Sequence, residues 1–450
     1  MKKIILLFIS GMLLLAHPGL ARENQNQADA TELVNSINLN WWNNFNDPIL
    51  VNYINQAINS NKDLKIAALD IQKQRAKVRE VFAKELPNLN MLGNFIRFRP
   101  DGVVHQGVIY QNFFTGAFAP AYEIDLLQKN RRKTKAQEQI LEGERQDARA
   151  VYIAIAADVA SAYINILSLD KSIIFQEEVV NLDGQAFFIR QAKYNAGLVS
   201  YSDVIEAETA LKDSEILLTE LERTKKVFLN QLAALTGLCP EGSECLPRGD
   251  FNNLRLNLPA NLVISSEKIM LRPDILKAEA LIKRAKLDVE FIRRDFLPNL
   301  NVYGILGFNT LDLTNLPNAR KYLTVIGAGV FHSLFPGGAR FARLRGAKYD
   351  YEQLLADYQQ TILTSLQEVN DNLVYLKSDL KISSDIDEKL RATEQHLYLV
   401  NVKYETGLIS CLDTLEDKKD VLLLSQDSIQ SRATYFFDYI NLYKTLAGNI

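Results

Sequence analysis

The sequence predicts an α+β protein built as a tandem structural repeat, in which each copy combines two short strands with two very long helices. Three observations predict it: motifs that recur about 210 positions apart, long stretches without proline, and aromatic, glycine-rich segments between those stretches. With 450 residues, the chain is long enough for two or three average domains. The copies are expected at 22–237 and 263–450, with an irregular linker at 238–262.

The repeat rests on short motifs that recur at nearly one offset. Leu86–Asn90 reads Leu-Pro-Asn-Leu-Asn and recurs as Leu297–Asn301, 211 positions later. Lys193–Leu198 and Lys403–Leu408 share Lys-Tyr and Gly-Leu at an offset of 210. Self-similarity of this kind indicates a tandem duplication. Further matches join Asp63 to Asp274, Ala67 to Ala278 and Leu235 to Leu446.

The helices are predicted from missing prolines and from a heptad pattern. No proline lies between Ala121 and Cys239, or between Gly337 and Ile450, and proline breaks helix interiors. Within these stretches apolar residues alternate at spacings of three and four, which is the repeat of a coiled coil. The first helix of a copy is then about 100 Å long. The expected helices are 129–193, 201–237, 340–404 and 411–447. The apolar series are Tyr152, Ile155, Val159, Ala162, Ile166, Leu169 and Ile173, and Ile362, Leu366, Val369, Leu373, Leu376 and Leu380.

A very short turn joins the two long helices of each copy. Gly197 follows the first helix and suits the left-handed position that ends many helices. Ser200 and Asp203 then have the spacing of a capping box, and Ser410 and Asp413 repeat it. Ser200 and Ser410 are therefore the expected helix caps of two helical hairpins. The turns are expected at 195–201 and 405–411.

Segments of another kind separate the proline-free stretches. They are rich in aromatic residues, glycine and alanine, and Leu300, Val302 and Leu306 alternate with polar or smaller neighbours. Strands of about ten residues with alternating polarity are typical of transmembrane barrels. A buried hairpin of a soluble protein is the alternative on this pattern alone. The expected strands are 87–98, 113–124, 299–308 and 322–331.

The N-terminus has the pattern of a secretory signal peptide at 1–21. Lys2 and Lys3 precede an apolar run from Ile4 to Ala16, and small residues mark a cleavage site after Ala21. A membrane anchor is the alternative, but the run is too short to cross ~30 Å of hydrocarbon. No later run of consecutive apolar residues is long enough for a membrane span, so we expect no helix that crosses a membrane.

Export favours a disulfide between Cys239 and Cys245, because exported proteins reach an oxidising compartment. Two free thiols are the alternative. The spacing does not fit a Cys-x-x-Cys metal site, and Cys411 is left unpaired.

The sequence carries no constellation of catalytic residues. It has no Gly-x-Ser-x-Gly, His-Glu-x-x-His or P-loop motif, and His105, His332 and His396 are scattered. We therefore expect no enzymatic activity, no cofactor and no metal site. The net charge of −3 gives no basic surface that would favour nucleic acid.

Four motifs in the first and second copies carry a family resemblance. They are Trp41-Trp42-x-x-Phe45-x-Asp47-Pro48-x-Leu50, Asn61-x-Asp63-Leu64, Leu86-Pro87 and Leu271-Arg272-Pro273-Asp274-Ile275. With them the sequence resembles TolC-type outer-membrane efflux factors, and among these the branch that serves resistance-nodulation-division pumps. The resemblance covers nearly the whole chain after the signal peptide.

The resemblance implies an α+β membrane protein, with a long coiled-coil α-barrel that continues into a trimeric 12-stranded β-barrel. Each chain of a homotrimer gives four strands, the helices form a periplasmic tunnel, and the linker 238–262 lies in an equatorial belt. The implied function is a passive exit duct of a tripartite efflux pump. The duct lies in outer-membrane lipid, extends into the periplasm, and works with a periplasmic adaptor protein and an inner-membrane pump. The duct of a type I protein secretion system and a soluble periplasmic coiled-coil scaffold are the rival functions.

The resemblance also implies which residues act at the helical tips. Asp203 and Tyr404 match a polar link that closes the tunnel, and Asp413 and Glu416 match an acidic ring at its constriction. Independently, residues three apart share one helix face, so Asp413 and Glu416 can face one pore. Helix capping alone is the alternative, because the helix dipole stabilises acids in a first turn. The turn residues that match the adaptor-binding tips are Gly197, Leu198, Val199, Gly407, Leu408 and Ile409.

The sequence departs from the family pattern at three places. Ile409 stands where well-known members have an arginine that completes the closed state. Pro336 replaces the aspartate of the usual Leu-Phe-Asp-Gly-Gly motif. No cysteine follows the expected cleavage site, although members of the resistance-nodulation-division branch are often lipidated there.

Overall fold

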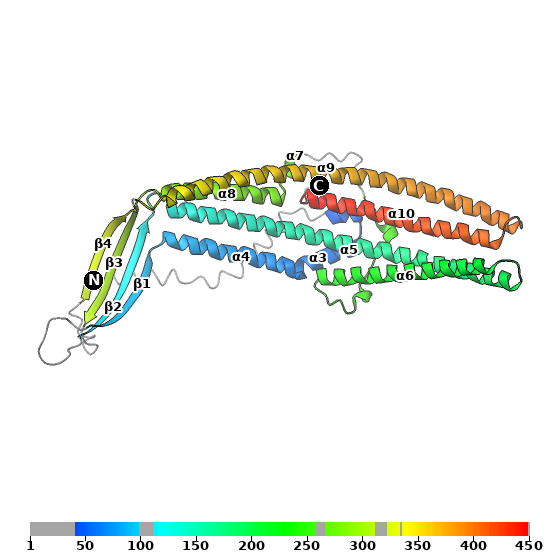
Figure 1. Ribbon diagram of the computed structural model, residues 1–450, viewed down its shortest axis with the longest axis horizontal. Helices are drawn as coiled ribbons and strands as arrows, with labels where there is room; N and C mark the ends of the chain where they lie inside the picture. The colour runs from blue at the N-terminus through cyan, green and yellow to red at the C-terminus, as the bar shows by residue number, and fades with distance from the viewer. Residues whose placement is uncertain (1–40, 99–110, 257–265, 311–321, 334, 449–450) are drawn as a thin grey trace. The chain divides into compact units, whose positions relative to one another are not determined.

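The chain divides into two compact units in the computed structural model (Figure 1). Unit 1 comprises Met1–Ala68, Asp147–Pro273 and Ile362–Ile450, and unit 2 comprises Leu69–Gln146 and Asp274–Thr361. The structure describes residues 41–98, 111–256, 266–310, 322–333 and 335–448. The expected signal peptide therefore lies outside the described residues.

Unit 2 contains a four-stranded antiparallel sheet, with the strands in chain order (Figure 1). The strands are β1 (Asn88–Phe98), β2 (Gln111–Ile124), β3 (Asn299–Thr310) and β4 (Tyr322–Phe331). β2 begins before and β3 ends after the expected bounds, because the ladder continues through Gln111, opposite Phe98, and Thr310, opposite Phe114. β1 and β4 form the edges, so in the described chain each has one side without a partner strand.

The register gives the sheet one apolar face. Residues directly opposite in an antiparallel pair share a face, and Met91 lies opposite Phe118, which lies opposite Leu306. Met91 is 78% and Ile326 83% exposed. The apolar face, named for most of its residues, includes Leu89, Met91, Phe95, Phe114, Phe118, Tyr122, Ile124, Leu300, Val302, Leu306, Ile326, Ala328 and Val330, and it also carries Arg97 and Thr324. On the other face, aliphatic, aromatic and small residues are mixed with the polar Asn88, Asn90, Asn94, Thr115, Glu123, Asn299 and Asn301. An exposed apolar surface of this extent indicates an apolar partner or environment.

The long helices have the same lengths in both copies. α5 (Lys129–Asn195) and α9 (Ala339–Glu405) have 67 residues each, and α6 (Tyr201–Leu235) and α10 (Cys411–Thr445) have 35 each. α6 and α10 both end two residues before the expected bounds. The reason lies after each helix, where Gly237 (φ 74°), Ala447 (φ 51°) and Gly448 (φ 82°) adopt the left-handed conformation that ends helices. The shorter helices are α3 (Pro48–Ser60), α4 (Lys62–Phe82), α7 (Ser266–Ile269) and α8 (Pro273–Arg294).

One described helix is long and apolar enough to cross a membrane, whereas none is expected from the sequence. α5 contains an 18-residue window that is apolar enough for a span by length and composition. However, 67% of this window is buried inside the structure. That burial is typical of a core helix, whose apolar residues pack against other helices rather than against lipid.

The aromatic residues of the N-terminal motif form part of the core of unit 1. The Trp41 ring stacks on Tyr443 of α10, with ring centroids 4.2 Å apart. The Phe45 ring meets the Tyr439 and Phe436 rings edge-on, at 5.6 and 5.7 Å. All five side chains are less than 5% exposed. The motif therefore joins the start of the described chain to its last helix.

Asp47 of the same motif joins three segments of unit 1. Its Oδ1 accepts the Ile49 N–H at 2.7 Å and so caps α3. Its Oδ2 accepts the hydroxyl hydrogen of Tyr163 at 2.8 Å, and the Tyr163 oxygen accepts the Gly249 N–H at 3.0 Å. Burial, together with the bond to Asp47, raises the pKa of Tyr163, so the phenol stays protonated as a donor. One carboxylate thus fixes α3, α5 and the linker together.

The linker contains only short 3₁₀ turns, η3 (Ser243–Cys245) and η4 (Phe251–Asn253), in its described part. Cys239 and Cys245 are exposed and free, so the disulfide expected between them is wrong for this structure. The segment is held on α6 by other contacts. The Ser243 hydroxyl donates to Asn230 at 3.0 Å, and Lys226 pairs with Glu244 at 2.9 Å.

We predict that all three cysteines of the chain are accessible thiols. Alkylation of the folded, non-reduced protein followed by peptide mass spectrometry should modify Cys239, Cys245 and Cys411, because each is exposed. The control is the same protein reduced before alkylation, which should give the same pattern. A cross-linked peptide that joins Cys239 to Cys245 would contradict the prediction.

A carboxyl pair with one buried member, Asp438, links α9 and α10 in unit 1. Asp438 is 8% exposed and hydrogen-bonds with Asp379. Burial, and then the neighbouring Asp379, raises the pKa of Asp438 from 3.8 to about 7. Between these two values the folded protein binds more protons than the unfolded chain. The pair's contribution to stability is therefore fully present at low pH and is lost as pH rises toward 7.

Replacing Asp438 with asparagine should remove this pH dependence. At pH 8 we expect Asp438→Asn to raise the free energy of unfolding by up to about 4 kcal/mol, whereas near pH 4 the variant and the wild type should be alike. Thermal unfolding followed by circular dichroism at the two pH values measures the effect. Asp385→Asn removes an exposed acid from α9 and is the matched control. Equal gains for Asp438→Asn at both pH values would disprove the linkage.

Candidate functional site at the helical tips

The turn between α5 and α6 is fixed by backbone geometry. Gly197 has a φ of 73°, which favours glycine. Its N–H donates to the Tyr194 carbonyl at 2.8 Å, and the Leu198 N–H donates to the Lys193 carbonyl at 2.9 Å, as in a Schellman motif. The Leu198 side chain is 73% exposed, and Val199 is half-buried. The turn thus presents one apolar side chain to the surroundings.

The turn between α9 and α10 has the same geometry. Gly407 has a φ of 76°, and the Leu408 N–H donates to the Lys403 carbonyl at 2.9 Å. Leu408 is 75% exposed, and Ile409 is half-buried. The six residues expected to face an adaptor therefore lie in two equivalent turns (Figure 1). Binding of an adaptor to them stays a prediction.

Both turns lead into capping boxes at the starts of α6 and α10. The Asp203 carboxylate accepts the Ser200 N–H and hydroxyl, both at 2.8 Å. The Asp413 carboxylate accepts the same two groups of Ser410, at 3.0 and 2.9 Å. The Ser200 hydroxyl, and then its N–H, lower the pKa of Asp203. The Ser410 N–H, and then its hydroxyl, lower the pKa of Asp413. Both carboxylates are therefore ionised at neutral pH and serve as caps.

The described part of the chain contains no hydrogen bond between Asp203 and Tyr404. The Tyr404 side chain is 44% exposed, and the Asp203 carboxylate is bonded to Ser200. The closing link between these two residues therefore stays a prediction for the assembled protein.

Arg190 of α5 instead joins the two tips within one chain. Its guanidinium lies 3.3 Å from the Glu206 carboxylate on α6 and 3.6 Å from the Glu416 carboxylate on α10. Arg190 is 23% exposed, whereas the two glutamates are 76% and 71% exposed. Arg190 thus brings a cation to the second tip, where Ile409 replaces the usual arginine. Sequence reasoning did not single out Arg190.

Further from the turns, α5 and α10 are joined by partly buried polar contacts. Lys419 donates to both carboxylate oxygens of Asp183, at 2.8 and 2.9 Å, and the Asp183 side chain is 8% exposed. Gln426 donates to Gln176 at 3.0 Å. On α5 these contacts are seven residues apart, at Gln176, Asp183 and Arg190. We call these three residues and their partners on α10 the polar seam.

The polar seam continues an apolar heptad position of α5. Ile155, Ala162 and Leu169 occupy the same position nearer the start of the helix. The change from apolar to polar residues at one heptad position is the signal in the sequence that could have revealed Arg190. The partners on α10 lie more than 220 residues away, and no local pattern identifies them.

The seam combines contacts of different strength. An ion pair with exposed partners, such as Arg190 with Glu416, contributes about 0–1 kcal/mol and is readily broken. The pair of Asp183 with Lys419 is less exposed, at 8% and 29%, so breaking it leaves a mostly buried carboxylate without its cation and costs more. The helices are therefore held together less firmly at the tips than at Asp183.

Comparison with known proteins decides which family the chain belongs to. The family model described as "Outer membrane efflux protein" matches it twice, at residues 53–238 and 264–448. The chain belongs to the outer membrane efflux protein family. This confirms the TolC-type resemblance and the outer-membrane location. The family consists of transport conduits rather than enzymes.

Relatives of this family match nearly the whole chain. The antibiotic efflux pump outer membrane protein ArpC of Pseudomonas putida is 26% identical over 91% of this chain and 84% of its own length. Outer membrane protein OprJ of Pseudomonas aeruginosa is 24% identical over 91% of this chain and 86% of its own length.

Solved structures show the same fold. The Campylobacter jejuni CmeC outer membrane channel superposes with a TM-score of 0.83 at 22% identity, covering 92% of this chain and 89% of that one. VceC from Vibrio cholerae superposes with a TM-score of 0.79 at 20% identity, covering 92% and 99%. The chain therefore has the helical-barrel fold of outer-membrane efflux channels.

Proposed function

We propose that three copies of this efflux protein form a passive exit duct in the outer membrane, gated at the helical tips. The observation that carries the proposal is the four-stranded sheet, which has one exposed apolar face and two open edges. In hydrocarbon every backbone group needs a partner within the protein, so a spanning sheet has to close into a barrel. Three chains with four strands each give a closed barrel of twelve.

The two faces of the sheet fit such a barrel. Lipid covers the apolar face, where Ile326 and Met91 are more than three-quarters exposed in one chain. The opposite face, which carries the asparagines, then lines an aqueous interior. The amphipathic register disfavours a soluble scaffold, because in water the apolar face would stay uncovered.

The long helices are the periplasmic part of the proposed duct. Their sustained heptads allow the helices of three chains to pack side by side into a tunnel. The two equivalent turns supply six similar apolar tips in a trimer, and we assign them to a periplasmic adaptor protein. An inner-membrane pump then delivers the substrate, and the duct itself consumes no energy.

Efflux is the favoured task of this duct. ArpC is named for antibiotic efflux, and CmeC and OprJ are named as outer membrane proteins. The duct of a type I protein secretion system remains the second candidate, because it would need the same barrel and tunnel.

We assign the gate to the acidic start of α10 and to the polar seam. Asp413 and Glu416 lie three residues apart on one helix face. Three copies concentrate negative charge around a narrow opening, which favours cations. Arg190 partly neutralises Glu416 in the closed state, and loss of this exposed pair accompanies opening.

Membrane extraction and conductance test the duct directly. We expect the mature protein to require detergent for extraction from outer membranes and to form discrete channels in a planar bilayer, because the apolar face needs hydrocarbon. A protein that stays soluble without detergent would instead be a scaffold, and the duct proposal would be wrong.

The gate is tested by cation block in the same bilayers. Asp413→Ala with Glu416→Ala should weaken block by a multivalent cation, because two carboxylates per chain are lost from the opening. Arg190→Gln should have the opposite effect and strengthen block, because Glu416 then loses its neutralising cation. We expect changes of at least about fivefold in the blocking concentration, which corresponds to about 1 kcal/mol.

The matched control for the gate is Asp213→Ala with Glu220→Ala, which removes the same charge from exposed positions of α6. Its block should equal that of the wild type. If the cation blocks the wild type and all variants at the same concentration, Asp413 is only a helix cap and the gate lies elsewhere.

A further inference from the structure

The four junctions between strands and helices of unit 2 share one pattern. Each presents an exposed basic side chain within five sequence positions of an exposed apolar one. The apolar side chains Leu86, Leu126, Leu297 and Phe341 are 51%, 70%, 44% and 68% exposed. The basic side chains are Lys84, Arg131, Arg293 and Arg345, which we call the basic collar.

The charges at the junctions oppose the helix dipole. Five of the first seven residues of α5, Lys129–Lys135, are lysine or arginine, and the first turn contains no acid. α9 likewise begins with Arg340, Arg343 and Arg345 and has no acid in its first turn. Cations at a helix N-terminus are destabilising, because the dipole is positive there. α6 and α10 follow the opposite rule, with an aspartate in the first turn of each.

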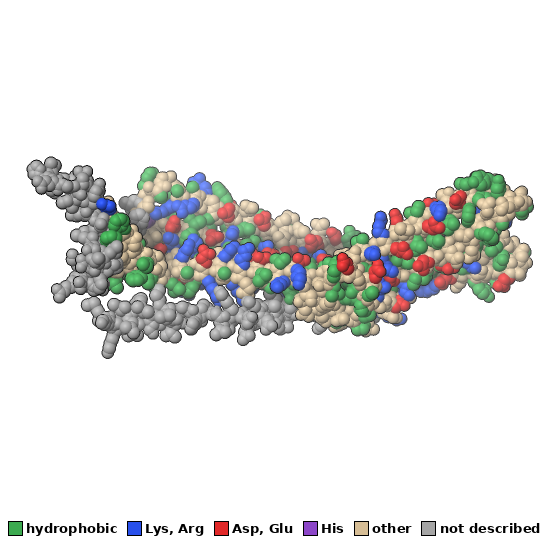
Figure 2. All heavy atoms as spheres, turned by 90° about the horizontal axis from the view of Figure 1, so that it is seen from below, with side chains coloured by type: hydrophobic (Ala, Val, Ile, Leu, Met, Phe, Trp, Pro, Cys, Tyr) green, Lys and Arg blue, Asp and Glu red, His purple; other side chains and the backbone are tan. Residues whose placement is uncertain are grey.

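Protein carboxylates neutralise only part of this charge. Lys129 pairs with Asp295 at 3.2 Å, and Arg132 pairs with Glu290 at 2.7 Å. Among the described residues, no ion pair involves a member of the basic collar. On the face shown in Figure 2, lysine and arginine side chains gather over the helices beside the strands. The positive charge of the basic collar therefore lies on the surface without a carboxylate partner, where an external anion can neutralise it.

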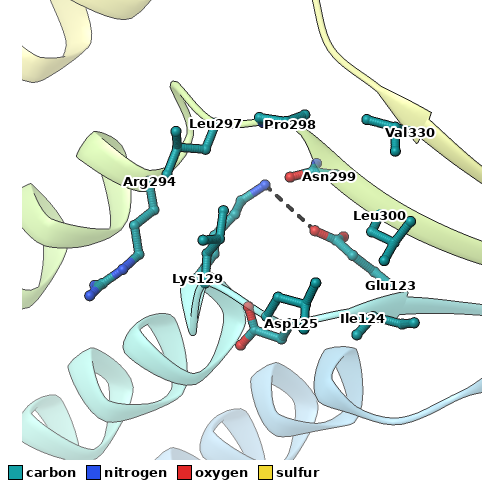
Figure 3. A pocket seen from close by; sticks show the side chains of 12 residues that line it. Glu123, Ile124, Asp125, Lys129, Arg294, Leu297, Pro298, Asn299, Leu300 and Val330 are labelled. Atoms are coloured by element: carbon teal, nitrogen blue, oxygen red, sulfur yellow. Dashed lines mark ion pairs between the residues drawn. The ribbon is translucent and has the colours of Figure 1, made fainter.

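A cavity between two of the junctions is lined by charged residues that do not belong to the basic collar. It has a volume of about 350 Å³ and lies where β2 leads to α5 and α8 leads to β3 (Figure 3). Inside it the Lys129 ammonium points to the Glu123 carboxylate, 3.9 Å away. Leu127 and Leu297 also line the cavity, and Ile124 and Leu300 connect it to the apolar face of the sheet. Both cations of its lining, Lys129 and Arg294, have carboxylate partners, so an external anion is left to the exposed collar.

We propose that the basic collar binds the phosphate groups of glycerophospholipids in the membrane leaflet next to the helices. This inference rests on the proposed function, because the sheet must span the membrane for the collar to meet a headgroup layer. Long basic side chains extend their charges into such a layer while neighbouring apolar side chains enter the acyl region. The pairs Lys84 with Leu86, Arg131 with Leu126, Arg293 with Leu297, and Arg345 with Phe341 supply both contacts at each junction.

Native mass spectrometry of the purified full-length protein tests the collar. The protein is mixed with phosphatidylglycerol or phosphatidylcholine, and the bound lipids are counted at low and at high salt. We expect phosphatidylglycerol to be retained more strongly, with a preference that falls as salt rises, because the contact is electrostatic. The variant with Lys84, Arg131, Arg293 and Arg345 all changed to Gln should lose at least about fivefold in phosphatidylglycerol retention, the equivalent of about 1 kcal/mol for one basic side chain.

The control variant removes the same charge from unit 1, by changing Arg223, Lys381, Lys389 and Arg391 to Gln; all four are exposed. It should keep the wild-type preference. Equal retention of the two lipids by the wild type, or an unchanged preference in the collar variant, would overturn the collar. The lipid preference of the wild type and its dependence on salt are measured without the variant. They can therefore refute the proposal even if the collar variant fails to fold. If the protein forms channels in a bilayer but shows no lipid preference, the duct proposal stands and only the collar is wrong. If it fails to insert into a bilayer, both proposals are wrong.

Discussion

The structure depends on a four-stranded sheet whose two edges remain open in one chain. Its apolar face is exposed and its two edge strands each lack a neighbour, although backbone groups in a membrane must be paired. The helices begin or end within a few residues of the strands, as where β2 ends at Ile124 and α5 begins at Lys129. In the proposed duct, closure of the sheet by other copies therefore also fixes where each long helix enters the periplasm.

Signals local in the sequence predicted most of the architecture. Missing prolines and heptads located the long helices, and Gly197 with Ser200 located a turn whose backbone has the expected left-handed glycine and cap. The ends of α6 and α10 were placed two residues too late, because the heptad pattern does not register the left-handed residues that follow each helix. The disulfide was wrong because contacts to α6 hold the η3 segment in place, which the spacing of two cysteines does not reveal.

The candidate site was less predictable than the fold. Capping residues are local, so Asp203 and Asp413 could be found from spacing alone. The contact of Arg190 with Glu416 joins the two copies across the sequence, and nothing local identifies the partner. The missing arginine at position 409 was visible, but its replacement by a cation from another helix depends on tertiary packing. The duplicated hairpins have thereby become unequal: the first supplies the bridging cation nearest the turns, Arg190, and the second supplies Lys419 further from them.

The polar seam also sets how much of each chain can move. Asp183 lies twelve residues before the end of α5 at Asn195, a distance of about 18 Å along the helix. Its buried pair with Lys419 resists separation far more than the exposed pair nearer the tip. In the proposed duct, a pivot at this depth confines widening of the mouth to the last few turns of the hairpins, so that the tunnel wall beyond Asp183 keeps its packing while the mouth changes its diameter.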